Sequence, residues 1–373
     1  MKKVLFVYGT RPEAIKMAPL IMEFKKRTDL FETKVCVTAQ HREMMDQINL
    51  FFGIRPDFDL NLMKKDQSLT SLTAEATTSL DLVYKQFTPD LVFVQGDTTT
   101  AFLGALIAFY NHIQIAHIEA GLRSFNKLSP YPEEVNRRLI SCMADIHFAP
   151  TNQAMLNLRQ EGIDNNVFVV GNTVVDALLL GLNIVQSQER EVSKQFDYLN
   201  FSQKIILVTG HRRESFGQPL NQICQAIKEI AISDSSVQIV YPVHLNPHVQ
   251  GPVLDILSGI KNIFLINPLG YRELIWLMSK SYLVITDSGG IQEEAPSLGK
   301  PVLVTRDVTE RMEGVAAGTA RLVGTNKEII INNVLDLLSN QDSYKQMAKS
   351  VNPYGDGQTC QRIVDIINQS LNL

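Results

Sequence analysis

The sequence predicts an α/β protein built from two domains, each with its own open parallel sheet. Its 373 residues exceed the size at which a single hydrophobic core keeps growing, so two domains of roughly 150 to 200 residues are expected. Short apolar, β-branched runs alternate with amphipathic helical stretches from end to end. That alternation is the pattern of parallel strands joined by crossover helices. Two such domains leave room for a cleft between them.

The candidate strands fall into two sets along the chain. In the first half they cover residues 4–8, 34–38, 91–95, 113–118, 146–149 and 167–170. In the second half they cover residues 205–209, 237–241, 263–266, 283–286 and 301–304. Each set therefore predicts a separate sheet.

The domain boundary is predicted near Gly171, ahead of a helical stretch and a polar, charged segment at residues 186–194. The first domain then covers residues 1–171 and the second covers residues 172–355. A last helix is predicted at residues 359–371, after the turn-forming Asn352-Pro353-Tyr354-Gly355. We expect residues 356–373 to return to the first domain.

Composition excludes several classes of protein. With 45% hydrophobic and 20% charged residues, the chain is typical of a globular soluble protein, and its net charge of -4 argues against a nucleic-acid partner. The four cysteines are scattered without Cys-x-x-Cys spacing, so neither a zinc site nor a disulfide framework is expected. The apolar run near the amino terminus ends after five residues, too short for a signal peptide, and no run reaches the length of a membrane span. We expect a cytoplasmic protein without a membrane partner.

Ligands of open α/β sheets bind beyond the carboxyl ends of the strands, so polar residues just after each strand are the first candidates. The segment 286–294 follows a predicted strand and leads into a predicted helix, with Ser288 as a candidate N-cap before Gly289 and Gly290. Free amides there favour a phosphate or pyrophosphate. Glu294 lies one helical turn beyond Gly290, where its carboxylate can accept hydrogen bonds from a ribose diol. The alternative is an ordinary strand-to-helix turn with a capping serine.

The first strand is followed by two cations at the start of a predicted helix. Arg11 and Lys16 flank Pro12, which suits the first turn of a helix. A guanidinium and an ammonium beside a glycine turn are able to neutralise a pyrophosphate leaving group. The spacing matches neither the P-loop nor the dinucleotide fingerprint. Solvated charges in a first helical turn are the alternative interpretation.

Three acids follow strands or turns in the same half of the chain, namely Asp97, Glu119 and Glu133. Carboxylates that lie close together at the opening of a cleft repel one another, so their proximity indicates a functional site. Glu119 is the sharpest candidate because it ends an apolar strand and precedes Ala-Gly. Asp97 can instead be a helix N-cap, and Glu133 can be a plain first-turn acid.

In the second half, His211 and Arg212 directly follow the strand at 205–209. A histidine at that position is able to donate to a phosphate or to move a proton near neutral pH. His244, which follows the strand at 237–241, is a weaker candidate of the same kind. The alternative for each is a histidine whose hydrogen bonds are made within its own loop.

Seven motifs, in order over nearly the whole chain, resemble those of the bacterial non-hydrolysing UDP-N-acetylglucosamine 2-epimerases. They are Gly9-Thr10-Arg11-Pro12-Glu13, Gln40-His41-Arg42, Gln95-Gly96-Asp97-Thr98, His117-Ile118-Glu119-Ala120-Gly121-Leu122-Arg123, Pro132-Glu133-Glu134-Val135-Asn136-Arg137, Gly210-His211-Arg212-Arg213-Glu214 and Asp287-Ser288-Gly289-Gly290-Ile291-Gln292-Glu293-Glu294. Departures from the family pattern stand at Ser215, Glu43 and Gln67.

The resemblance implies a glycosyltransferase-B fold, in which two Rossmann-like domains enclose a cleft. It also implies a cytoplasmic homodimer that uses neither a metal nor a nicotinamide cofactor and supplies UDP-N-acetylmannosamine for surface polysaccharides. The implied reaction eliminates UDP to give a 2-acetamidoglucal and then adds UDP back after C2 is reprotonated from the other face. That route requires a held pyrophosphate, acid/base groups near C2 and carboxylates that stabilise an oxocarbenium-like centre.

Residue by residue, the resemblance implies catalytic roles for Asp97, Glu119, Glu133 and His211. Asp97 is the candidate for proton transfer at C2, Glu119 for charge stabilisation or a second proton transfer, and Glu133 for support. The implied substrate-binding residues are Arg11, Lys16, Arg137, His211, Arg212, Ser288, Gly289, Gly290 and Glu294. A regulatory substrate position is implied at Gln40, His41 and His244.

Three other functions share these features. A glycosyltransferase of the same fold would use the same UDP site, but acceptor activation usually needs one base rather than three acids. A hydrolysing 2-epimerase would differ only in letting water capture the glucal. A UDP-sugar sensor without catalysis would not need the full set of catalytic-type residues.

Overall fold

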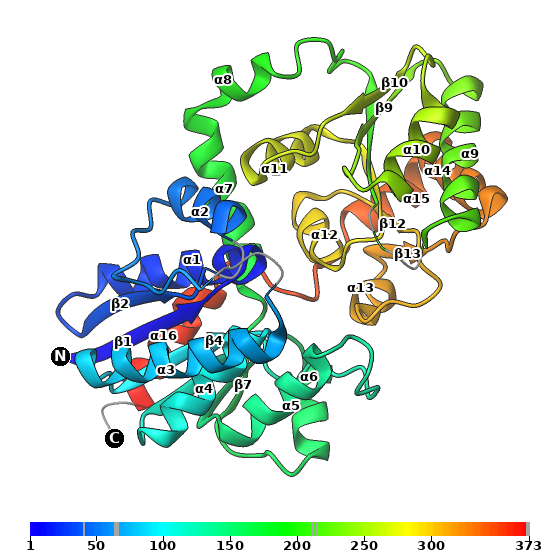
Figure 1. Cartoon of the computed structure of the whole chain (residues 1–373). Coiled ribbons are helices and arrows are strands. Elements are labelled where there is room, and N and C mark those ends of the chain that lie inside the picture. The colour runs from blue at the N-terminus through cyan, green and yellow to red at the C-terminus, as the bar shows by residue number, and fades with distance from the viewer. Residues whose placement is uncertain (40–41, 63–66, 211, 213–214, 371–373) are drawn as a thin grey trace. The chain divides into compact units, whose positions relative to one another are not determined.

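The computed structural model describes residues 1–39, 42–62, 67–210, 212 and 215–370. By its internal contacts the chain divides into two compact units, residues 1–180 with 354–373 and residues 181–353 (Figure 1). The chain passes from the first unit to the second within a helix, ten residues beyond Gly171, and it returns between Pro353 and Tyr354.

Within the described residues, the first unit contains a seven-stranded parallel sheet in the order β3-β2-β1-β4-β5-β6-β7. Its strands are β1 (Lys2–Tyr8), β2 (Phe31–Val37), β3 (Phe58–Asp59), β4 (Leu91–Gln95), β5 (Gln114–Ile118), β6 (Ile146–Ala149) and β7 (Val167–Val169). Its helices are α1 (Arg11–Lys26), α2 (Arg42–Phe51), α3 (Leu69–Phe87), α4 (Thr99–Tyr110), α5 (Glu133–Met143), α6 (Asn152–Gln160), the start of α7 (Thr173–Ser187) and α16 (Thr359–Ser370).

The strand order of this sheet reverses between β1 and β4, so the crossover helices cover both of its faces. Helices α1, α2 and α16 pack together, and α3, α4 and α5 pack together. The central strands β1, β4, β5 and β6 are mostly buried, which explains why they appear in the sequence as apolar runs. The prediction that the C-terminal helix returns to the first domain is confirmed by the contact between α16 and α1 (Figure 1).

The second unit contains, in its described part, a six-stranded parallel sheet in the order β10-β9-β8-β11-β12-β13. Its strands are β8 (Lys204–Thr209), β9 (Val237–Pro242), β10 (Ile263–Ile266), β11 (Leu283–Thr286), β12 (Val302–Val304) and β13 (Ala320–Leu322). Its helices are the end of α7, α8 (Glu189–Lys194), α9 (Gln218–Ser233), α10 (Pro247–Leu257), α11 (Tyr271–Lys280), α12 (Gly289–Glu294), the 3-10 turn Ala295–Leu298, α13 (Met312–Ala316), α14 (Lys327–Ser339) and α15 (Gln341–Ala348).

The prediction of two Rossmann-like α/β domains is confirmed, and all eleven candidate strands are present within a few residues of their predicted ends. The two edge strands β3 and β13 were not predicted. They are two and three residues long, too short to produce an apolar run in the sequence. Among the described helices, none is both long and apolar enough to cross a membrane.

Candidate functional site

The first sheet brings the predicted acids to one edge, next to the point where its strand order reverses. Strands β4 and β5 are neighbours, with Gln95 in register with Ile118. Asp97 and Glu119 therefore follow adjacent strands at the same carboxyl edge. The turn that contains Arg11 follows β1, the strand on the other side of β4. This edge is where ligands bind in open α/β sheets.

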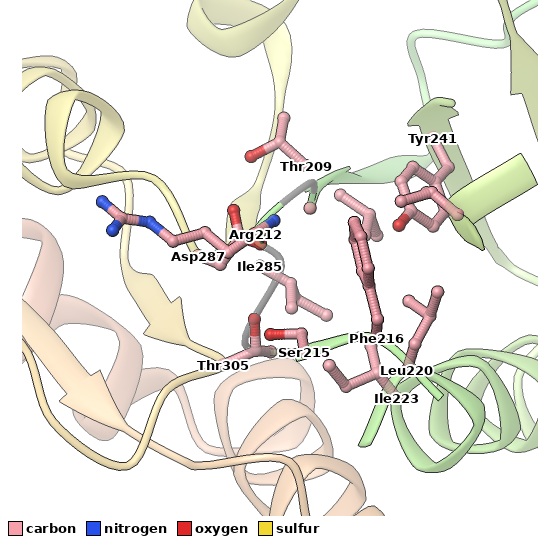
Figure 2. A pocket seen from close by; sticks show the side chains of 13 residues that line it. Thr209, Arg212, Ser215, Phe216, Leu220, Ile223, Tyr241, Ile285, Asp287 and Thr305 are labelled. Carbon is pink, nitrogen blue, oxygen red and sulfur yellow. Dashed lines mark hydrogen bonds between the residues drawn. The ribbon is translucent and has the colours of Figure 1, made fainter. Parts of the chain in front are cut away.

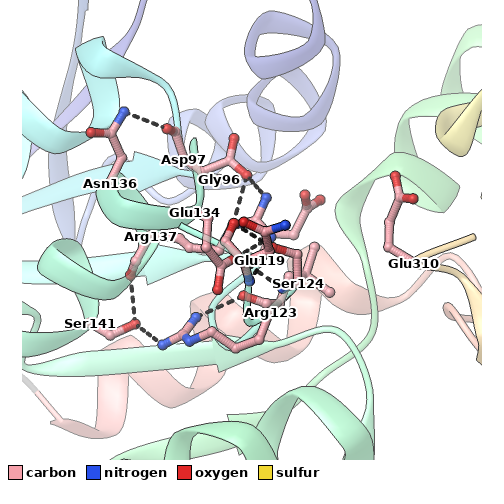
Figure 3. A network of polar contacts seen from close by, with 12 residues as sticks. Gly96, Asp97, Glu119, Arg123, Ser124, Glu134, Asn136, Arg137, Ser141 and Glu310 are labelled. Atoms are coloured by element: carbon pink, nitrogen blue, oxygen red, sulfur yellow. Dashed lines mark hydrogen bonds and ion pairs between the residues drawn. The ribbon is translucent and has the colours of Figure 1, made fainter. Parts of the chain in front are cut away.

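Asp97 is held by the first turns of α5. The Arg137 guanidinium donates to Asp97 Oδ2 through Nε at 3.1 Å and also through Nη2 (Figure 3). The Asn136 side chain donates to the Asp97 carbonyl at 2.9 Å. Both the backbone and the carboxylate of Asp97 are thereby fixed by one helix, and Arg137 places a positive charge beside that carboxylate.

Arg137 is itself held by Glu134, a buried acid in the same helix. Glu134 Oε2 lies 3.2 Å from Arg137 Nη1 and accepts the Ser124 amide at 2.9 Å, while Oε1 accepts the Phe125 amide at 3.1 Å (Figure 3). Glu134 is 1% exposed. The chain of contacts from the Ser124 loop through Glu134 and Arg137 to Asp97 fixes the acid from behind.

Glu119 is buried and has an unusual backbone. Its φ of 63° lies in the left-handed region, which non-glycine residues seldom adopt and which is often found at functional sites. Its Oε2 pairs with Lys16 Nζ from α1 and accepts the Asn172 side-chain amide at 2.9 Å. Lys16, predicted from sequence as a phosphate ligand, thus lies against a predicted catalytic acid.

Glu133 and Arg11 stand at the starts of helices. Glu133 is the first residue of α5, and its Oε2 is buried without a hydrogen-bond partner in the part of the chain that the structure describes. A buried carboxylate oxygen in that condition is costly unless a ligand or water reaches it. Arg11 opens α1 and is exposed.

Another buried acid, Glu13, joins the turns after β1 and β4. Glu13 Oε2 accepts the Gly9 and Thr10 amides at 3.1 and 2.8 Å, and Oε1 accepts the Thr98 hydroxyl at 2.7 Å. Burial raises the pKa of this carboxyl, against the lowering effect of those hydrogen bonds. Since Glu13 occupies these amides, the glycine turn after β1 does not offer them to a phosphate.

Two neutral histidines lie behind the acids. His117 Nε2 contacts the Gly96 carbonyl at 2.7 Å, next to Asp97. Burial lowers the pKa of His117 to about 3 and that of its cross-strand neighbour His147 to about 4. Both rings are therefore uncharged at neutral pH and support the turn without adding charge.

In the second sheet the reversal point lies between β8 and β11, and polar turns follow both strands. Thr209 and Thr286 join the strand ends through their hydroxyls at 2.7 Å. The Arg212 amide donates to Asp287 Oδ2 at 2.8 Å. Thr209, Arg212 and Asp287 form one side of a pocket. Its other side is apolar and includes Phe216, Leu220 and Ile223 (Figure 2).

In the segment Ser288-Gly289-Gly290, the Ser288 amide donates to the Thr286 hydroxyl at 3.0 Å, and the two glycines that follow carry no side chain. Ser288 occupies the N-cap position of α12 as predicted, but its side chain makes no capping hydrogen bond. A Cβ on Gly290 would have no neighbour closer than 3.9 Å among the described residues. The next side chains are turned inward: Gln292 accepts the Thr309 hydroxyl at 2.8 Å, and Glu293 accepts Arg311 Nε at 2.7 Å.

Glu294, the predicted ribose ligand, is 7% exposed. Burial and the nearby Glu294 carboxylate raise the pKa of the Tyr271 hydroxyl well above its usual value. Gly290 lies close to this acid, because its Cβ position is 3.9 Å from Glu294 Oε2. The helical spacing predicted for Gly290 and Glu294 is thus present.

Three arginines surround Glu310 in the second unit. Its carboxylate lies 2.9 Å from Arg306, 3.3 Å from Arg311 and 3.7 Å from Arg212. Burial raises the pKa of Glu310, but Arg311, Arg306 and Arg212 act in the opposite direction and bring it to about 2. Gly289 adjoins this cluster, with its Cβ position 3.5 Å from Glu310 Oε1.

Three predicted residues, Gln40, His41 and His211, lie outside the described residues. His244 is exposed, and its Nδ1 accepts the Asn246 amide at 3.1 Å. The catalytic position of His211 and the regulatory position of Gln40, His41 and His244 stay predictions.

The sequence analysis did not assign Glu13, Glu134, Asn136 and Asn172. Asn172 follows β7 by three residues, so a search of all strand ends would have found it. Glu13, Glu134 and Asn136 lie inside helices, and only the fold shows what they contact.

The two Rossmann-like sheets, with acids after one and a glycine turn after the other, define a two-domain α/β protein of the glycosyltransferase-B type. The family model for UDP-N-acetylglucosamine 2-epimerase matches residues 23–368. The chain therefore belongs to the UDP-N-acetylglucosamine 2-epimerase family.

Individual relatives match over their full length. The UDP-N-acetylglucosamine 2-epimerase of Campylobacter jejuni is 51% identical over 100% of this chain and 99% of that protein. The one of Salmonella typhimurium is 52% identical over 98% of each. The crystal structure of UDP-GlcNAc 2-epimerase from Neisseria meningitidis bound to UDP-GlcNAc superposes with a TM-score of 0.91 at 48% identity, covering 98% of this chain and 100% of that one.

Proposed function

We propose that this chain interconverts UDP-N-acetylglucosamine and UDP-N-acetylmannosamine by inverting C2 of the sugar. The observation that carries the proposal is the placement of Asp97 and Glu119 at adjacent strand ends, each paired with a cation. The chain's family supports the choice of substrate, because a 48% identical relative was crystallised with UDP-GlcNAc.

The C2 proton is not acidified by a neighbouring carbonyl, so elimination is the chemically accessible route. The C2–H bond breaks as Asp97 accepts the proton, the C1–O bond to UDP breaks with the electron pair leaving on the diphosphate, and a C1=C2 double bond forms. Return of a proton to the opposite face of C2, with addition of the UDP oxygen to C1, gives the epimer. General acid/base transfer of this kind contributes about 10²- to 10⁴-fold in rate.

The other groups supply charge stabilisation and binding. Glu119 is placed to stabilise positive charge that develops at C1 or to carry the second proton, with Glu133 in support. Arg11, Arg212 and the Ser288-Gly289-Gly290 backbone are the proposed ligands of the diphosphate, and Glu294 that of the ribose.

Arg137 and Lys16, predicted as substrate ligands, have a second proposed role. Each is engaged with an acid, so each sets the position of that acid as well as the charge that the substrate meets. We further propose a cytoplasmic homodimer that makes precursors for surface polysaccharides.

The proposal is tested by incubating the protein with UDP-N-acetylglucosamine in deuterium oxide and following the sugar by NMR. We expect UDP-N-acetylmannosamine with deuterium at C2 and a return of label into the starting sugar. Accumulation of free N-acetylmannosamine would instead establish a hydrolysing epimerase. An unlabelled substrate, turned over only when an acceptor is added, would establish a glycosyltransferase.

A further inference from the structure

Asn172 lies where three features of the first unit meet. It follows β7, directly precedes α7, and is 2% exposed. Its Nδ2 donates to Glu119 Oε2 at 2.9 Å, its Oδ1 accepts the Val174 amide at 3.1 Å, and its backbone amide donates to the Tyr354 carbonyl at 2.6 Å. One residue thus contacts an acid at the site, the start of α7 and the returning chain.

The backbone around Asn172 is tightly packed against the returning segment. Gly171 has a φ of 97°, and a Cβ there would lie 2.7 Å from the Thr359 hydroxyl and 3.3 Å from the Tyr354 carbonyl oxygen. Gly355 has a φ of 141°, and a Cβ on it would lie 3.6 Å from the Asn172 amide nitrogen. These contacts leave Asn172 little freedom to move relative to residues 354–355.

The second partner of Glu119 belongs to the same assembly. Lys16 pairs with Glu119, and its neighbour Ile15 packs against Val174, Val175 and Tyr354. Lys16, on α1, therefore lies next to a residue that packs against the elements where the chain leaves the first unit and comes back to it.

We propose that Asn172 is a positioning residue for Glu119, which it ties to the two chain segments that join the units. The inference rests on the proposed function for the role of Glu119. The Asn172 amide and the Lys16 ammonium both contact Oε2, so the carboxylate keeps one orientation on its left-handed backbone. A side chain that acts through Glu119 should change turnover more than substrate binding.

Asn172→Asp isolates the contact with Glu119. An aspartate keeps an oxygen for the Val174 amide and so preserves the start of α7, but it replaces the amide donor with a second carboxylate. Among the described residues, the charged or titratable groups that face Glu119 include Lys16 from α1 and His117 from its own strand; burial lowers the pKa of His117 to about 3, so its ring is neutral at the pH of the assay. Like charges in contact resist ionisation.

The measurement is the pH profile of kcat for epimerisation, with the Michaelis constant determined at each pH. For Asn172→Asp we expect kcat at neutral pH to fall by about tenfold or more and the acid limb of the profile to move up by about one pH unit, with the Michaelis constant changed by less than about twofold. Asn172→Ser, which keeps an oxygen near Val174 but cannot reach Glu119, should lower kcat without moving the limb.

Asn326→Asp is the matched control, because Asn326 also accepts a helix-start amide, that of Ile329 at 3.1 Å, but lies at the start of α14 in the second unit. It should leave the profile unchanged. If Asn172→Asp keeps a normal kcat and the acid limb of its pH profile does not move, the positioning role is wrong, while the proposed function stays intact. Absence of C2 exchange in the unaltered protein would overturn the proposed function itself, and the inference with it.

Discussion

The two sheets share one topology but carry different chemistry at their carboxyl ends. In both, the strand order reverses once, and polar turns follow the strands on either side of the reversal. After the first sheet these turns carry ion-paired acids, Asp97 with Arg137 and Glu119 with Lys16. After the second sheet, Gln292 and Glu293 are turned into contacts of their own, and the backbone of Ser288-Gly289-Gly290 is presented.

The difference shows how one scaffold can serve two tasks. Ion-paired side chains are able to move protons and stabilise developing charge, whereas exposed backbone amides bind an anion without titrating. We therefore expect changes at the acids of the first unit to affect turnover and changes at the glycine turn of the second to affect UDP binding.

The largest effect is expected for Asp97→Asn. The amide keeps the shape of the side chain but cannot accept the C2 proton, so deuterium incorporation should fall by about 10²- to 10⁴-fold. The dissociation constant of UDP, measured by calorimetry, should stay within about twofold if the two units divide the work as described.

Asp90→Asn is the control for that change. Asp90 lies just before the same strand, β4, at its amino end, where Oδ2 accepts the Lys3 amide at 2.7 Å. It should leave exchange unaffected. Loss of UDP binding in Asp97→Asn would contradict the assignment of proton transfer to this residue and would break the contrast between the units.

A smaller effect, of opposite kind, is expected for Gly290→Ala. In the part of the chain that the structure describes, the added methyl has no neighbour closer than 3.9 Å, and the glycine has an ordinary φ, so the fold should tolerate it. If a diphosphate approaches the backbone there, its affinity should drop about tenfold, equivalent to about 1.4 kcal/mol.

The Gly290→Ala comparison uses calorimetric titration with UDP and thermal unfolding in parallel. Gly251→Ala, in the interior of α10 and also free of close neighbours, is the matched control and should bind UDP normally. Unchanged affinity in Gly290→Ala would place the diphosphate elsewhere.

The last expected effect concerns acid stability rather than activity or binding. The folded-state pKa values of His117 and His147, about 3 and about 4, lie below the ordinary value of 6.5. The unfolded chain therefore binds more protons than the folded one below pH 6.5. The contribution of these two histidines to the free energy of unfolding is fully present above that pH and is lost as the pH falls toward 4. Each histidine contributes a slope of up to about 1.4 kcal/mol per pH unit in this window.

Both histidines lie in the first unit, so that unit should weaken first on acidification. Amide hydrogen exchange of β4, β5 and β6 reports it, while the fluorescence of the single tryptophan, Trp276, buried in α11, reports the second unit. His147→Gln should roughly halve the slope in the first unit. Equal acid sensitivity of both units would contradict this explanation.

Much of the molecule was predictable from local patterns. The buried parallel strands appear as continuous apolar runs, so both sheets were found, and the strand-end rule led to Asp97, Glu119 and the Ser288 turn. The crossing between the units was harder to place: the chain passes from one to the other within α7, ahead of the polar segment at residues 186–194. The first turns of α7 pack on Tyr354, a residue far away in sequence.

The sequence by itself determined the fold class and the residue types at the strand ends, because hydrophobic periodicity and glycine turns are properties of neighbouring residues. Only the tertiary structure decided which charges meet. The contacts Lys16–Glu119, Arg137–Asp97 and Asn172–Glu119 join residues 40 to 103 positions apart. Such pairings depend on strand order and on the packing of α1 and α5 beside the sheet, which no local pattern specifies.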